Sequence, residues 1–158
     1  MSKPLLTILA TACALALPAL AHSRQVTLTA QLKDYGGNGA YVAAYLTDAK
    51  GAYVRTLWVA GGKAKYHKHL SDWSRLSAGD TKRLDGVTGA SVGSGRTLKV
   101  TADLADALID AGYEIRLDAA AEDMRDSPSE VRMPLSTANV GKPQAGKQYI
   151  QSVTLQLK

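Results

Sequence analysis

Apolar and polar side chains alternate along much of this chain, and this period of two restricts its fold more than any other feature. In residues 149–157, Val153 and Leu155 fall on one side while Thr154 and Gln156 fall on the other, as in a half-buried strand. The segments predicted as strands are 24–33, 41–47, 53–59, 97–102, 113–121, 131–135 and 149–157. About seven short strands favour an all-β, immunoglobulin-like β-sandwich, with a small barrel as the alternative.

Two segments have the spacing of short helices. In residues 66–76, Leu70 and Trp73 lie three positions apart and share one face of a helix. In residues 104–111, apolar residues recur at helical spacing before Gly112, a typical stop. We therefore expect one or two short helices beside the strands.

Three segments near the C-terminus are predicted from their polar content. Residues 122–130 are charged and contain a proline, which favours an exposed connection. Residues 131–135 are predicted as an edge strand, because Pro134 cannot donate to a strand ladder. Residues 136–147 are predicted as a polar loop.

Residues 1–21 resemble a secretory signal peptide, with a basic start, an apolar run over 5–17 and a small-x-small ending at Ala21. The apolar run is shorter than the roughly 20 residues of a membrane span. The single cysteine, Cys13, lies inside this segment, so the mature chain has no thiol for a disulfide or a metal. We expect one mature domain, residues 22–158, in the periplasm and without membrane insertion.

The charge of the chain is mildly positive. It has 19 basic and 14 acidic residues, and the basic ones are scattered along the sequence. A nucleic-acid-binding arm would concentrate them in one stripe or patch. We therefore expect a solvated surface and no nucleic-acid partner.

Residues 85–91 read Asp-Gly-Val-Thr-Gly-Ala-Ser and are the one stretch whose residue types suggest chemistry. Gly89 and Ala90 make the backbone thin just before Ser91, so another protein surface could approach the Ser91 hydroxyl closely. The alternative is a surface loop between strands, in which the glycines simply allow tight turns.

The stretch resembles the acceptor motif of FMN transferases of the ApbE type: Asp, two free positions, Ser or Thr, Gly, Ala, and a Ser or Thr that receives FMN. Chance would produce it in roughly one chain in a thousand of this size. The resemblance implies covalent FMN, joined by a phosphoester to Ser91. The recognition residues that it implies are Asp85, Thr88, Gly89 and Ala90.

The surroundings of an attached FMN can also be anticipated. Its phosphate would lie beside residues 93–95, whose amides could contact it, with the charge of Arg96 close by. An exposed aromatic side chain could stack on the isoalloxazine ring. The candidates are Tyr53, Trp58, Tyr66 and Trp73, although such residues more often belong to the core.

A wider resemblance includes residues 53–58, 66–73 and 85–91, in that order. Over nearly its whole mature length, the chain is similar to a family of predicted periplasmic bacterial proteins that has been catalogued as a domain of unknown function. Genes of that family are often found with PepSY-type membrane proteins and FMN transferases. The resemblance implies a flavin carrier in electron transfer outside the cytoplasm, and not an enzyme with its own substrate.

Two alternatives remain at this point. One is a non-redox, immunoglobulin-like binding or assembly module of the cell envelope, in which the loop serves a partner. The other is a metal or haem site at His67 and His69, although two histidines are an incomplete ligand set. Surface histidines among lysines are the favoured interpretation of this pair. An N-terminal copper site at His22 would lack further ligands.

Overall fold

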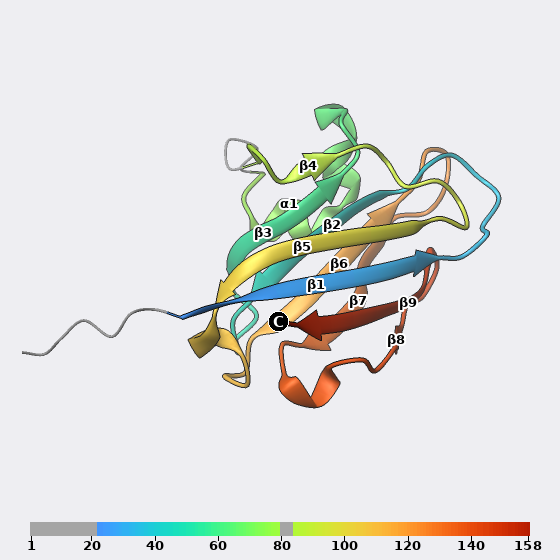
Figure 1. The fold of residues 1–158 in the computed structure, drawn as a ribbon. Helices are drawn as coiled ribbons and strands as arrows, with labels where there is room; N and C mark the ends of the chain where they lie inside the picture. The colour runs from blue at the N-terminus through green and yellow to red at the C-terminus, as the bar shows by residue number, and fades with distance from the viewer. Residues whose placement is uncertain (1–21, 80–83) are drawn as a thin grey trace, which may run out of the picture.

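The seven predicted segments all form strands, and two further two-residue strands join them in two sheets (Figure 1). The computed structural model describes residues 22–79 and 84–158. One sheet has the order β5-β1-β9-β8 and contains β1 (Ser23–Leu32), β5 (Thr97–Ala105), β8 (Gln144–Ala145) and β9 (Ile150–Leu157). The other has the order β4-β3-β2-β6-β7 and contains β2 (Tyr41–Thr47), β3 (Tyr53–Ala60), β4 (Thr88–Gly89), β6 (Glu114–Ala120) and β7 (Ser127–Pro134). The all-β sandwich is confirmed, and the two separate sheets exclude the barrel alternative.

The main core lies between the two sheets, as the alternation predicted. Leu28 and Leu32 of β1 lie beside Val153 and Leu155 of β9 in one sheet, and belong to the same core as inner side chains of the other sheet, such as Leu117. These side chains are at most 2% exposed. Each fully buried side chain of this size stabilises the fold by about 1.5–3 kcal/mol, so this layer dominates the stability of the domain.

A second, smaller core covers the outer face of the five-stranded sheet. The 3₁₀ helix η1 (Ala64–His69) and the helix α1 (Ser71–Leu76) lie there, which confirms the helical prediction for residues 66–76. Leu70 and Trp73 pack on Tyr45 and Val59 of the sheet. Strand β2 is therefore buried on both faces.

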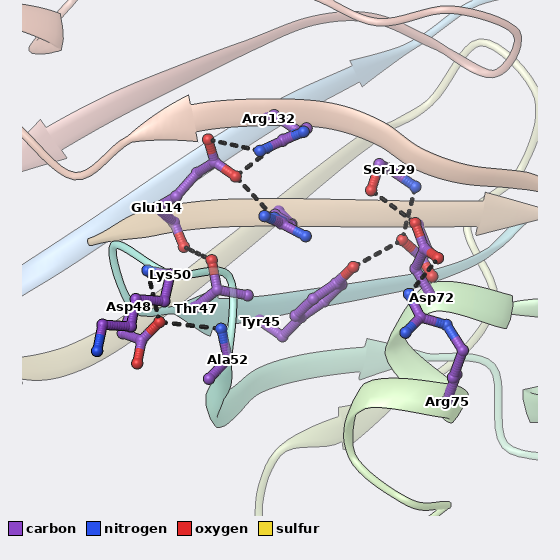
Figure 2. Close-up of polar contacts among 12 residues, drawn as sticks. Tyr45, Thr47, Asp48, Lys50, Ala52, Asp72, Arg75, Glu114, Ser129 and Arg132 are labelled. Atoms are coloured by element: carbon purple, nitrogen blue, oxygen red, sulfur yellow. Dashed lines mark hydrogen bonds and ion pairs between the residues drawn. The ribbon is translucent and has the colours of Figure 1, made fainter. Parts of the chain in front are cut away.

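A buried carboxylate fastens α1 to this sheet. Asp118, on β6, accepts hydrogen bonds from the Trp73 amide at 2.7 Å, the Ser129 amide at 2.8 Å and the Tyr45 hydroxyl at 3.0 Å. Figure 2 shows Tyr45, Ser129 and Asp72 of α1 gathered around this point. Burial raises the pKa of Asp118, against the opposing effect of these three donors. One side chain thus links β2, β6, β7 and α1.

A second buried carboxylate links the two sheets. Glu130, on β7, is 1% exposed, and its Oε1 accepts hydrogen bonds from four successive amides, residues 147–150, at 2.8–2.9 Å. The Ser127 hydroxyl also donates to Glu130. Burial alone would raise the pKa of Glu130, but the hydrogen bonds, led by the one from Ile150, lower it below its usual value.

Two sequence predictions are wrong. Residues 104–111 do not form a helix: β5 continues through Leu104, which pairs with Arg24 and is 1% exposed, and only one 3₁₀ turn, η3 (Asp106–Leu108), follows. The end of a strand and a 3₁₀ turn together mimic the spacing of a helix. Residues 122–130 are not wholly an exposed connection, because β7 begins at Ser127 and Glu130 is buried.

Other connections agree with the predictions more closely. Strand β7 is an edge strand of its sheet, as Pro134 indicated. The predicted loop at 136–147 contains the short 3₁₀ helix η4 (Thr137–Asn139) and strand β8. Among the described residues, no helix is long and apolar enough to cross a membrane.

The Glu130 contacts predict an acid-sensitive contribution to stability. Replacing Glu130 with Gln puts an amide group where only an acceptor fits, so Glu130→Gln should lower the free energy of unfolding at pH 7 by at least about 2 kcal/mol. The folded pKa is lowered, so the wild-type advantage is complete above the unfolded pKa of about 4.3 and shrinks as the pH falls through the folded pKa. Urea denaturation at pH 7 and pH 3 measures both effects.

The matched control is Glu122→Gln, which removes an exposed carboxylate and should change the free energy of unfolding little at either pH. Equal stability of Glu130→Gln and the wild type at pH 7 would contradict the assigned role of Glu130.

Candidate functional site

Residues 84–91 begin in the second core and end at an exposed serine. Leu84 is buried and its carbonyl accepts a hydrogen bond from the Val87 amide at 3.0 Å, which closes a tight turn. Gly86 has a φ of +75° in this turn, a conformation that favours glycine. Asp85, beside it, is exposed. The predicted recognition carboxylate therefore lies on the surface, at the start of the segment.

The middle of the motif is fixed to the sheet as a strand. Strand β4 pairs with β3 in parallel, and the amides of Val59 and Gly61 donate to the carbonyls of Val87 and Gly89, both at 2.8 Å. A Cβ on Gly89 would lie 2.6 Å from Cζ2 of Trp58, so only glycine fits here without displacing the indole. The motif glycine thus has a structural requirement that sequence reasoning missed.

The predicted acceptor, Ser91, lies in the segment between β4 and β5. Next to it, Val92 is buried and pairs with Ala40, with amide-to-carbonyl distances of 2.9 and 2.7 Å. A Cβ on Gly39 would lie only 2.7 Å from Oγ of Ser91. Thr88, Ala90 and Ser91 itself are exposed. The Ser91 hydroxyl is therefore accessible on a backbone that is fixed at both sides.

The segment after the acceptor forms a turn against the loop that follows β1. The Ser94 hydroxyl donates to Asp34 at 3.0 Å and the Gly95 amide donates to the Lys33 carbonyl at 2.9 Å. The Gly95 amide is therefore already engaged, which removes one of the predicted phosphate contacts. The Arg96 side chain runs back along Gly93, with its Cγ 3.2 Å from the position of a Cβ there. Its predicted contact with a phosphate stays a prediction.

Ser91 lies on the wall of a cavity of about 770 Å³. This volume is within the range of about 300–1,000 Å³ that is typical of small-molecule sites. Its lining residues are Asn38, Gly39, Tyr41, Lys63, Tyr66, His69, Ser91, Ala120, Ala121, Glu122, Asp123, Met124 and Asp126. Of these, sequence reasoning had named only Ser91, Tyr66 and His69. The other members come from distant parts of the chain and share no local motif.

Aromatic and charged side chains form one wall of the cavity. Tyr41 and Tyr66 meet edge to face, with ring centroids 5.5 Å apart, and the Tyr66 hydroxyl donates to Glu122 at 3.1 Å. Nδ1 of His69 lies 3.1 Å from both carboxylate oxygens of Asp126. These contacts fix the side chains before any ligand is present.

The two histidines do not form a shared site. His67 was expected on the surface, but it is only 7% exposed. Its Nε2 lies 2.8 Å from the carbonyl oxygen of Gly61, which can only accept a hydrogen bond, so Nε2 carries the proton. His69 turns instead to Asp126. Within residues 22–79 and 84–158, no three His, Cys, Asp or Glu side chains are grouped for a metal ion.

The packing of Gly89 predicts a local effect of substitution. Gly89→Ala should force Trp58 and β4 apart, and so break the hydrogen bonds from Val59 and Gly61. Amide hydrogen exchange at these two positions should accelerate by at least tenfold. The control is Gly62→Ala, because a Cβ at Gly62 meets open space. Unchanged exchange in Gly89→Ala would contradict the proposed packing.

Comparison with known proteins agrees with the exported location expected from the sequence. No curated protein and no solved structure matched the chain. One family model, described as "Predicted periplasmic protein (DUF2271)", matches residues 23–152, nearly all of the sandwich including β4 and Ser91. The chain belongs to this family of predicted periplasmic proteins.

Proposed function

We propose that this protein carries FMN in electron transfer outside the cytoplasm, with the flavin joined by a phosphoester to Ser91. The observation that supports it best is the presentation of this hydroxyl: exposed, between two fixed backbone anchors, and on the wall of a cavity. The close approach of Gly39 also limits the positions that the serine hydroxyl can take.

Attachment requires a transferase and an activated FMN donor such as a flavin dinucleotide. Oγ of Ser91 would form a bond to the FMN phosphorus as the pyrophosphate bond of the donor breaks. The nucleoside monophosphate leaves, and the serine proton is released. Asp85 and Thr88, both exposed, are positioned for recognition by the enzyme, and the absence of large side chains at Gly89 and Ala90 lets it approach Ser91.

The cavity suits the flavin in size and character. FMN, when bound, would supply one- and two-electron redox chemistry. The chain would contribute a covalent attachment point at Ser91, an aromatic wall at Tyr41 and Tyr66, and polar groups such as Lys63. The partners are an FMN transferase, which loads the flavin, and a membrane-bound redox protein of the PepSY type, which exchanges electrons with it.

Intact-mass measurement tests the attachment. Wild-type protein produced with an FMN transferase should gain the mass of one FMN group, and Ser91→Ala should gain none. Ser91→Thr keeps a hydroxyl and should still be loaded. Ser94→Ala is the matched control, because Ser94 lies nearby but already donates to Asp34. An FMN increment that persists in Ser91→Ala would sink the proposal.

The same measurement separates the proposal from a non-redox binding module. A module of that kind would show no FMN increment and no visible absorbance with any transferase. The flavin carrier should be colourless, and still folded, only when it is produced without a transferase.

The contact between Gly39 and Ser91 predicts a slower attachment reaction when it is altered. Gly39→Ala should push Oγ of Ser91 out of its present position, so the initial rate of FMN incorporation should fall by roughly tenfold, about 1.4 kcal/mol of barrier. Gly62→Ala should load at the wild-type rate. Time-resolved mass spectrometry with a limiting amount of transferase measures this rate, and equal rates for both variants would contradict the prediction.

A further inference from the structure

We infer that the cavity beside Ser91 is the binding site of the isoalloxazine ring, and that Tyr66 forms the wall that shields it from solvent. The inference rests on the proposed function, because it takes FMN on Ser91 as its starting point. It adds the place of the redox-active ring, which the attachment point alone does not determine.

The first argument is proximity. Ser91 and Tyr66 line the same cavity, as does Gly39, which lies directly against the serine. A flavin attached at Ser91 therefore has this cavity next to its point of attachment. The residue after Ser91, Val92, is paired with Ala40, and this pairing closes that side.

The second argument is that the cavity, like the ring, has apolar and polar parts. The isoalloxazine ring has an apolar dimethylbenzene end and a polar pyrimidine end with carbonyl and N–H groups. The cavity contains both characters: Ala120, Ala121 and Met124 are apolar, whereas Lys63 can donate hydrogen bonds to the ring carbonyls and Nε2 of His69 can accept one from the ring N–H. Aromatic rings and a few placed polar groups are the usual composition of a cofactor site.

The third argument is that the wall is arranged in advance. The Tyr66 ring is held by its neighbours: Nζ of Lys65 lies 4.7 Å from the ring centroid, and Tyr41 packs edge to face on the ring. The Tyr66 hydroxyl is held by Glu122. Nδ1 of His69 faces Asp126, so Nε2 is the nitrogen left for a ligand. Little side-chain freedom would be lost when a ring enters.

Collisional quenching of flavin fluorescence by iodide tests the inference. In wild-type protein loaded with FMN, the quenching constant should be at least threefold smaller than in the same loaded protein unfolded in urea. Tyr66→Ala should raise the constant of the folded protein at least twofold. Tyr66→Phe is the matched control: it keeps the ring, loses only the hydrogen bond to Glu122 and should resemble the wild type.

Equal quenching constants in folded and unfolded wild type would overturn the inference without any variant, so it does not depend on the folding of Tyr66→Ala. An unchanged constant in a folded, loaded Tyr66→Ala protein would also overturn it. The two proposals fail differently. A missing FMN mass increment overturns the flavin carrier itself, whereas a loaded protein with an unprotected ring overturns only the role of the cavity.

Discussion

The buried carboxylate of Asp118 is the contact on which the candidate site depends. It accepts a hydrogen bond from the Trp73 amide. This bond holds α1, and η1 just before it, against the outer face of the five-stranded sheet. Tyr66 and His69 belong to η1, so one wall of the cavity is present only because this helical segment is fixed there. The other wall comes from the chain around Ser91, which is joined to β3 and to Ala40. The site is thus a product of packing on the outer face and at the β4 edge of one sheet.

Burying a carboxylate is costly unless hydrogen bonds replace the water that it loses. Asp118 has three donors, and Glu130 has four backbone amides together with the Ser127 hydroxyl. Burial, together with the nearby charge of Asp72, keeps the pKa of Asp118 raised, whereas the larger number of donors lowers the pKa of Glu130 below its usual value. The two groups also act in different places: Asp118 holds the cavity wall on one sheet, while Glu130 joins that sheet to the segment that enters β9.

The sequence predicted what depends on periodicity and missed what depends on backbone contacts. The alternation of apolar and polar residues around Val153 identified β9, and the spacing of Leu70 and Trp73 identified the helical segment. Both patterns reflect which side chains are buried. Strand β4 has only two residues and no pattern to detect. Glu130 appeared to be a surface acid, because its partners are backbone amides 17 to 20 positions further along. The cavity was equally hidden, since its walls unite segments around residues 39, 66, 91 and 124 that only the fold brings together.

A covalent bond changes what a cofactor site must provide, and the architecture around Ser91 fits that change. A short flexible tether gives the attached ring an effective concentration in the millimolar range, so an intrinsic affinity of about 4 kcal/mol is enough to keep the ring in the cavity half of the time. Burying about 100 Å² of apolar ring surface contributes about 2.5 kcal/mol, and one or two aromatic contacts contribute about 1 kcal/mol each. Tyr41, Tyr66 and Met124 can supply these terms. The proposed phosphoester would likewise replace the amide cradle that free phosphate needs, which is consistent with a Gly95 amide that is engaged within its own loop.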